Sequence, residues 1–177
     1  MNSSADVERR QRFDRVVMAL HAALYRYAAW LCRDPHIAEV IVQESLLRAW
    51  RALDTLREDH AAKQWLLTIA RRENARYFEK KSPVMVDIDN LSSTQSAMIA
   101  DTGDPDVDDV RRAIYRLEDG YREPLVLQVL MGYSTKEIAE LMGIGQGAVL
   151  TRLHRARLKL KASIDGAGCR TMARDSG

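Results

Sequence analysis

The segment STKEIAELMGIGQGAVLTRLHRARLKL, residues 134–160, sets the architecture of the C-terminal half, because it holds three glycines in five residues between two helical patterns. Ser134 followed by Glu137 is a capping box, which predicts that a helix begins there. Gly143 supplies the left-handed residue that ends this helix, and Gly145 stands at the N-cap of the next one. A short helix, a glycine-containing turn and a second helix predict a helix-turn-helix.

The second helix of this motif has two faces of different character. The apolar repeat of four, three and four residues places on the inner face Val149, Leu153, Ala156 and Leu160. These residues are expected to share a small core with Ile138, Leu141 and Ile144. The outer face then carries Gly147, Thr151, His154, Arg155 and Leu158, with Arg152 on its flank.

This outer face predicts contact with a DNA major groove. Arg155 can form two hydrogen bonds with guanine, and Thr151 and His154 can bond to base edges. Arg152 and the positive N-terminal ends of both helices suit phosphates. The candidate DNA-binding residues of this motif are Ser134, Thr135, Lys136, Gln146, Thr151, Arg152, His154 and Arg155. The alternative is a basic helix face that is only solvated.

Charge divides the chain into three parts. Residues 1–81 have a net charge of +4, residues 82–110 a net charge of −7, and residues 111–177 a net charge of +5. The sequence therefore predicts an N-terminal domain over 1–81, a flexible acidic linker over 82–107, a C-terminal domain over 108–165 and a disordered tail over 166–177. A solvated acidic loop without a specific role is the alternative for the linker, in which residues 84–89 could form a short extended piece.

Helical periodicity dominates both halves, so the expected fold class is all-α, with two small helical domains. Apolar residues recur every three or four positions between Phe13 and Leu31, and Pro35 with Asp34 as N-cap starts the next helix. In that helix the apolar positions Ile37, Ile41, Leu47 and Trp50 mostly follow a helical repeat. A third helix is expected over residues 61–81, and four more over 106–117, 122–132, 134–143 and 146–164.

With these motifs in place, residues 121–160 resemble the promoter-reading C-terminal domain of bacterial sigma factors, especially the extracytoplasmic-function (ECF) group. The chain keeps the positions that the family uses in its second helix: Gly147, Val149, Arg152, Leu153, Arg155, Ala156 and Arg157. It departs from the family at Gly145, Ala148 and Leu150, where a polar cap, Thr and a basic residue are usual. Leu150 can touch a thymine methyl group but cannot bond guanine, so the promoter sequence does not carry over from relatives.

Residues 33–53 are similar to the family's docking helix for core RNA polymerase. The resemblance implies that the polymerase-binding residues are Glu39, Gln43, Glu44, Leu47, Arg48 and Trp50. Polar bonds around an apolar contact are typical of partner-binding helices. Val40 stands where the family usually has an acid. An ordinary surface helix with solvated glutamates is the alternative.

Residues 61–81 mix basic and aromatic side chains, a combination that suits a single strand with unstacked bases. The resemblance implies that this region opens the promoter near the minus-ten element and holds a flipped base near Trp65. The candidate residues are Trp65, Arg71, Arg72, Arg76, Tyr77 and Lys80. Relatives usually have Asn at Arg72 and Asp at Arg76. Core packing is the alternative role for Trp65.

No pattern in the sequence indicates an enzyme. The four histidines are dispersed, and no phosphate-binding glycine loop or paired catalytic carboxylate is present. We expect no cofactor and no metal; Cys32 and His36 could supply two ligands but have no second pair. Two cysteines and the lack of an apolar run of about eighteen residues favour a cytoplasmic protein.

The sequence therefore predicts an alternative sigma factor that binds core RNA polymerase and promoter DNA. Family behaviour implies an anti-sigma factor that holds it inactive. Two other classes stay open. One is a dimeric helix-turn-helix regulator with an N-terminal sensing domain, and the other is a sigma-like adaptor that titrates an anti-sigma factor.

Overall fold

The computed structural model describes residues 4–81 and 105–172. Within these ranges the chain is helical and contains no strand, which confirms the all-α class. The chain divides into two compact units, Met1–Asp89 and Asn90–Gly177. The extended piece expected at 84–89 and most of the expected linker lie outside the described residues. No described helix has the length and apolar character that a membrane span requires.

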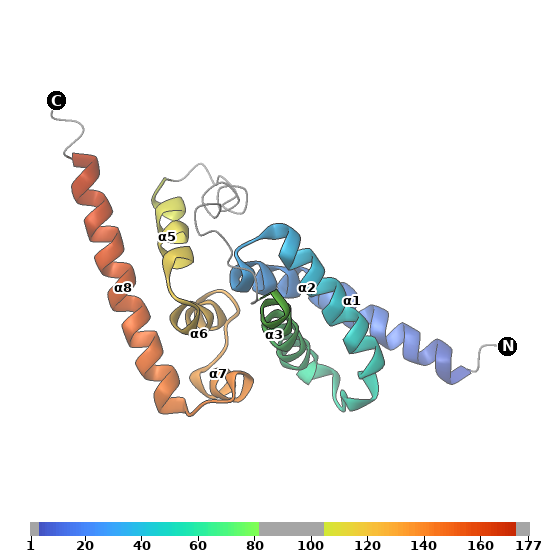
Figure 1. The fold of residues 1–177 in the computed structure, drawn as a ribbon. Helices are drawn as coiled ribbons and strands as arrows, with labels where there is room; N and C mark the ends of the chain where they lie inside the picture. Colours follow the sequence, from blue (N-terminus) through green and yellow to red (C-terminus); the bar gives the residue numbers. More distant parts are fainter. Residues whose placement is uncertain (1–3, 82–104, 173–177) are drawn as a thin grey trace. The chain divides into compact units, whose positions relative to one another are not determined.

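The N-terminal unit begins with two long helices, α1 (Ser4–Cys32) and α2 (Pro35–Arg51) (Figure 1). Arg33, with a φ of 60°, ends the first helix, and Asp34 caps the second. The Asp34 carboxylate accepts hydrogen bonds from the backbone N–H groups of His36 (2.8 Å) and Ile37 (3.0 Å). The predicted start of α2 is therefore confirmed, because the cap satisfies two amides that a helix start leaves unpaired.

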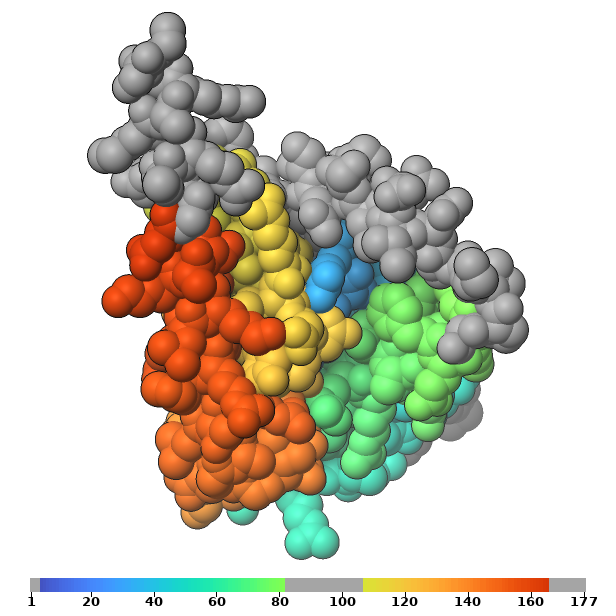
Figure 2. Space-filling model, turned by 60° about the vertical axis from the view of Figure 1, so that its left-hand side comes forward, coloured from blue at the N-terminus to red at the C-terminus, as the bar shows by residue number. Residues whose placement is uncertain are grey.

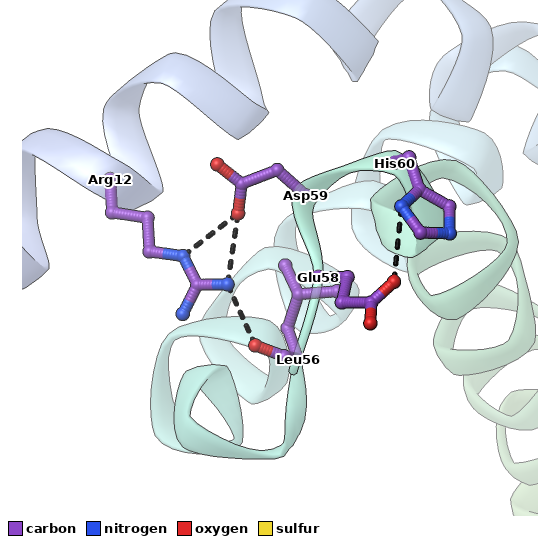
Figure 3. A network of polar contacts seen from close by, with 5 residues as sticks. All are labelled: Arg12, Leu56, Glu58, Asp59 and His60. Atoms are coloured by element: carbon purple, nitrogen blue, oxygen red, sulfur yellow. Dashed lines mark hydrogen bonds and ion pairs between the residues drawn. The ribbon is translucent and has the colours of Figure 1, made fainter.

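Two short 3-10 turns, η1 (Leu53–Thr55) and η2 (Asp59–Ala61), connect α2 to α3 (Ala62–Lys81). Arg12 of α1 fixes this connection, as Figure 3 shows. Its Nε donates to Asp59 Oδ1 at 2.9 Å, and its Nη2 donates to the Leu56 carbonyl at 2.7 Å. The loop beyond carries an exposed pair, His60 and Glu58, with Nδ1 and Oε2 3.2 Å apart. One arginine thus holds the loop against the first helix.

The core of the N-terminal unit lies where α1, α2 and α3 pack on one another. Helix α1 buries Val16, Leu24 and Tyr27, and α2 buries Ile41 and Val42. Leu47, which falls on the expected helical repeat, is 55% exposed and so lies outside this core. The buried face of α2 instead uses small residues, which allow close helix packing: Ala38, Ser45 and Ala49.

The C-terminal unit contains α5 (Pro105–Arg116), α6 (Asp119–Val129), α7 (Thr135–Met142) and α8 (Gln146–Met172). Figure 1 shows α8 as the longest of the four, running past the other three. In Figure 2 α8, in orange to red, lies at the surface beside α5, in yellow. Contacts of α8 with α5, α6 and α7 make it the central element of this unit.

A buried arginine joins the first two helices of the C-terminal unit. Arg122 is 1% exposed. Its Nη1 donates to the Leu117 carbonyl at 2.8 Å, and its Nη2 donates to Asp119 Oδ1 at 2.6 Å. The guanidinium therefore fixes the end of α5 against the start of α6, since a buried charge needs both a counter-charge and hydrogen bonds.

The predicted bounds of two helices were wrong. Helix α6 begins and ends three residues earlier than expected, because the Glu118 carbonyl accepts the first turn's amides and the chain then turns at Gly132 with a φ of 76°. Helix α8 continues to Met172, into the segment that was expected to be disordered from residue 166. A helix already nucleated by packing adds one hydrogen bond per residue, and no proline stops it.

Candidate nucleic-acid interface

Helix α7 begins as the sequence predicted. The Ser134 hydroxyl accepts a hydrogen bond from the Glu137 amide at 3.3 Å, and the Glu137 carboxylate accepts one from the Ser134 amide at 2.8 Å. This reciprocal capping box satisfies backbone donors at the helix start, so it fixes where the helix begins.

The turn after α7 also follows the prediction. Gly143 adopts the left-handed conformation with a φ of 66° and a ψ of 35°. The Ile144 amide then donates to the Ala139 carbonyl at 3.1 Å, and the Val149 amide donates to the Gly145 carbonyl at 3.2 Å. Gly145 therefore precedes the first turn of α8. The helix-turn-helix is confirmed as a fold.

The two faces of α8 lie as the periodicity predicted. Val149, Leu153 and Ala156 are buried, and Leu160 is half-buried. The exposed residues are Gly147, Thr151, His154, Arg155 and Leu158, with Arg152 half-buried between the faces. The expected core residues Ile138 and Leu141 are buried, whereas Ile144 is half-buried. The candidate DNA-binding side chains of α8 therefore face away from the core.

A hydrogen bond joins the beginnings of the two helices of the motif. Gln146 Nε2 donates to Thr135 Oγ1 at 2.9 Å. The two residues are both candidate phosphate contacts, and this bond holds their helix starts close together. Helix starts present amide groups and a positive dipole end, which together favour an anion. Lys136, in the first turn of α7, is exposed and adds a positive charge there.

The basic residues of α8 differ in what they contact. Arg157 Nη2 donates to Gln128 Oε1 at 2.7 Å, and Lys159 Nζ donates to Glu118 Oε1 at 2.6 Å. This hydrogen bond with Glu118 raises the pKa of Lys159 above its usual value. In contrast, Arg152 and Arg155 form no hydrogen bond or ion pair with the residues that the structure describes. Their guanidinium donors are therefore available to a ligand.

Two further candidates on this face have different polar environments. Thr151 Oγ1 donates to the Gly147 carbonyl at 3.0 Å, so its hydroxyl can accept but no longer donate without a rearrangement. His154 is exposed, and nothing in the described part of the chain pairs with it. The face thus offers two arginines, an imidazole and a hydroxyl acceptor.

The outward face of α2 is the second candidate surface. Glu39, Gln43 and Glu44 are exposed, and the apolar Val40 and Leu47 are exposed beside them. The three polar side chains have no hydrogen-bond or ion-pair partner among the described residues. An apolar strip between polar side chains is the composition of a protein-binding face rather than of a fully solvated one.

The other two candidates on α2 are used inside the unit. Arg48 Nε lies 2.5 Å from Glu73 Oε1 of α3. Trp50 packs against Phe13, with ring centroids 5.2 Å apart, and the Arg9 guanidinium lies 4.9 Å from the Trp50 ring. Since these contacts join α2 to α1 and α3, Arg48 and Trp50 stabilise the three-helix packing.

The aromatic candidates of α3 also serve packing. Trp65 lies against an apolar cluster, and its Nε1 donates to Thr55 Oγ1 at 3.1 Å. The cluster consists of Val16, Leu53, Leu56 and Ala62. Tyr77 lies under the Lys81 ammonium, with Nζ 4.5 Å from the ring, and contacts Phe78 edge to face. These contacts favour the core role that the sequence left open for Trp65.

The basic residues of α3 divide in the same way as those of α8. Arg72 and Lys80 are exposed and unpaired within the described ranges, whereas Arg71 is half-buried. Arg76 Nη1 lies 3.0 Å from Glu73 Oε1. Glu73, which was not predicted as a functional residue, is 7% exposed and pairs with two of the candidate arginines, Arg48 and Arg76. One feature of the sequence could have identified this residue: an acidic side chain stands at a position where the helical repeat predicts burial, and basic residues lie on both sides of it.

Side chains that could coordinate a metal do not cluster in the described part of the chain. No group of three or more His, Cys, Asp or Glu side chains there could hold a metal ion. Cys32 is a buried free thiol, and its Sγ donates to the Asp34 carbonyl at 3.1 Å.

By its architecture the chain is an all-helical protein with an N-terminal three-helix unit and a C-terminal helix-turn-helix unit. Two family profiles match these units: sigma-70 region 2 over residues 16–83 and sigma-70 region 4 over residues 108–160. The chain therefore belongs to the sigma-70 family and, by the relatives below, to its ECF RNA polymerase sigma factors.

The match to curated relatives covers most of this chain and most of each relative. The ECF sigma factor SigL of Mycobacterium tuberculosis is 32% identical over 157 residues, which cover 84% of this chain and 86% of SigL. SigM of Bacillus subtilis is 32% identical over 143 residues, covering 78% of this chain and 86% of SigM. EcfG of Rhodopseudomonas palustris is 29% identical over 154 residues, 85% of each chain.

Two solved structures are similar to this chain. The sigma factor RpoE of Bartonella quintana, in complex with the anti-sigma factor NepR, matches with a TM-score of 0.67 and 25% identity over 86% of this chain and 96% of that one. CnrH, in complex with the cytosolic domain of CnrY, matches with a TM-score of 0.64 and 26% identity over 87% of this chain and 88% of that one.

Proposed function

We propose that this ECF sigma factor directs core RNA polymerase to promoters that it reads with α8. The observation that carries the proposal is the outward face of α8, where Arg152, His154 and Arg155 have no partner among the described residues and project from a capped helix-turn-helix. Major-groove reading needs donors that the protein itself does not occupy.

The residues assigned to the upstream element form one surface around the motif. Arg155 and His154 are proposed to read bases, and Thr151 accepts a hydrogen bond from a base. Phosphates are bound by Arg152, by Lys136 and by the joined helix starts, which include the other candidates Ser134, Thr135 and Gln146.

The polymerase is proposed to dock on α2. Its exposed face combines Val40 and Leu47 with Glu39, Gln43 and Glu44, so it offers an apolar centre between acceptors and donors. Arg48 and Trp50, first assigned to this surface, are proposed to support it from behind, since both are engaged by α1 or α3.

Promoter opening is proposed to use α3. Arg72, Arg76 and Lys80 repeat every four residues and are all exposed, which suits contact with the phosphates of one strand. Arg71 and Tyr77 flank this stripe. Trp65 is proposed to stabilise the loop between α2 and α3 through Thr55 rather than to stack on a base.

An anti-sigma factor is the proposed regulator. RpoE of Bartonella quintana was solved with the anti-sigma factor NepR, and its fold covers 86% of this chain. The acidic segment 82–107 is proposed to act as the linker between a polymerase-docking domain over 1–81 and a promoter-reading domain over 108–165, in a cytoplasmic protein that itself carries out no bond-making reaction.

The test is transcription with purified core RNA polymerase on fragmented genomic DNA from the host of this protein. We expect discrete new transcripts that require both the protein and the core enzyme, with the core enzyme alone as the control. A dimeric helix-turn-helix regulator would bind DNA without the polymerase and produce no such transcripts. A titrating adaptor would bind an anti-sigma factor and produce none either. Failure to bind the core enzyme at all would overturn the proposal.

A further inference from the structure

One buried carboxylate in the N-terminal unit has two cationic partners. Glu73 of α3 is 7% exposed, and its Oε1 lies 2.5 Å from Arg48 Nε and 3.0 Å from Arg76 Nη1. The two arginine side chains are 47% and 46% exposed, respectively. The group therefore has a net charge of +1, with its negative charge inside and its positive charges at the surface.

The two arginines have different structural roles. Arg48 comes from α2, so its ion pair holds α2 and α3 together. Arg76 lies three residues beyond Glu73 on α3, so its ion pair joins no separate elements. A buried carboxylate needs a counter-charge, because leaving it unpaired is strongly destabilising. With Arg48 in place, Glu73 stays paired even when Arg76 leaves.

The position of Arg76 indicates which ligand could draw it away from Glu73. Arg72, Arg76 and Lys80 lie four residues apart and form one exposed stripe on α3. Arg72 and Lys80 form no polar contact within the described residues, whereas Arg76 is held by Glu73. Arg76, the central cation of the stripe, is therefore the one that is paired in the free protein.

We propose that Glu73 holds Arg76 in reserve and releases it to a phosphate of single-stranded promoter DNA, while Arg48 alone then balances the negative charge of Glu73. Glu73 and Arg48 are then positioning residues, and Arg76 is the DNA-binding residue. This inference rests on the proposed function and assigns one step of promoter opening to an exchange of ion pairs. The exchange forms and breaks no covalent bond.

The exchange of ion pairs predicts that DNA binding by Arg76 depends on Arg48 and on Glu73. Without Arg48, Arg76 becomes the remaining counter-charge of a buried carboxylate, so it can no longer leave. Arg48→Gln should therefore weaken DNA binding although Arg48 touches no DNA. Adding Glu73→Gln removes the charge that retains Arg76, so the double variant should bind DNA at least as tightly as the wild type. A purely structural role predicts the opposite, since the second change removes a further contact.

The experiment measures binding of the complete chain, assembled with core polymerase, to a fluorescein-labelled fork promoter with a single-stranded minus-ten part. Affinity is measured by anisotropy over a series of KCl concentrations. We expect Glu73→Gln to bind about two- to fivefold more tightly than the wild type, the range for a partly exposed ion pair. Arg76→Gln should reduce the slope of log affinity against log salt by about 0.7, the value for one phosphate contact on a single strand.

Thermal unfolding and core-polymerase affinity of each variant serve as controls. They separate the exchange from misfolding and from direct polymerase contact by Arg48, which would persist in the double variant. If the double variant binds no better than Arg48→Gln, or if Arg76→Gln leaves the salt slope unchanged, the exchange is wrong. A wild-type protein that fails to bind polymerase would overturn the proposed function instead, so the two failures are distinguishable.

Discussion

The basic residues of α8 show that local neighbours decide which charges are available to a ligand. Arg155 and Arg157 are two residues apart and both exposed, yet only Arg157 bonds to another helix, through Gln128. Arg155 has no polar partner in the part of the chain that the structure describes, so its donors are available to a base or a phosphate. Sequence periodicity placed Arg155 on the outer face correctly, but it could not show that Arg157 is paired, because Gln128 is distant in sequence.

Arg155→Ala provides the most specific test of base reading. Since the proposed bidentate contact with guanine would be lost, we expect binding to fall by about 1 to 3 kcal/mol at one base pair of the upstream element. The measurement is a competition assay with every single-base variant of that element. Arg157→Ala is the matched control and should leave the base preference unchanged. An equal loss on unrelated DNA would make Arg155 a phosphate contact.

The raised pKa of Tyr133 predicts how the stability of the C-terminal unit changes at alkaline pH. Burial, and then the nearby Glu137 carboxylate, raise the pKa of Tyr133 to about 12. The unfolded tyrosine loses its proton near pH 10. Between these values the unfolded state binds fewer protons, so the free energy of unfolding falls as the pH rises.

Tyr133→Phe removes the titrating group and isolates this effect. From pH 10 towards pH 12 we expect the wild type to lose roughly 2 kcal/mol relative to Tyr133→Phe, because one pKa unit corresponds to about 1.4 kcal/mol. Urea unfolding at pH 7, 10 and 12 measures the difference. Parallel losses in the two proteins would show that the Tyr133 hydroxyl is not the cause.

At the scale of helices, the corner between α7 and α8 depends on short-range signals. The capping box and the left-handed Gly143 involve residues within one turn of each other, so the sequence alone predicted them. The same holds for the Asp34 cap of α2. The ends of α6 and α8 were mispredicted, since they depend on the turn at Gly132 and on helix propagation after packing.

Glycine variants test the corner with an internal control. Gly143→Ala should destabilise the protein by about 1 kcal/mol or more, because alanine avoids the left-handed conformation with a φ of 66°. Gly147 lies inside α8 with open space around it, so Gly147→Ala should stabilise by up to about 1 kcal/mol. Thermal unfolding measures both. If the two changes have the same sign, the turn does not constrain residue 143.

Contacts between helices set the limit of prediction from sequence. The sequence identified Arg48 and Arg76 as functional candidates but not Glu73, which pairs with both. Helical periodicity reports which face of a helix is buried, and it contains no information on which buried acid meets an arginine from another helix. The same limit applies to Trp50, whose partners Arg9 and Phe13 lie on α1.

At the scale of the whole molecule, function requires two interfaces on one chain. Helix α2 exposes an apolar strip between polar groups that have no partner within residues 4–81 and 105–172, and α8 exposes cations that have none there either. The first surface suits a protein and the second a polyanion. A factor that brings a polymerase to DNA needs both surfaces, whereas either one alone would serve a different class of protein.

Changing Gln43 and Glu44 together to Ala tests whether the two interfaces are separable. Because both side chains are exposed and unpaired within the described residues, the fold should be unaffected. We expect core-polymerase binding to weaken at least about tenfold, as for polar groups near the centre of an interface. Binding of the polymerase-free protein to the upstream element should stay unchanged.

Gln11→Ala with Asp14→Ala is the matched control, since it removes an exposed amide and an exposed carboxylate from α1 instead. It should leave polymerase binding intact. Fluorescence titration of labelled core enzyme measures all three proteins. Unchanged binding by the α2 variant would move the docking surface elsewhere. Loss of DNA binding as well would mean that α2 acts on the whole protein and not on one interface.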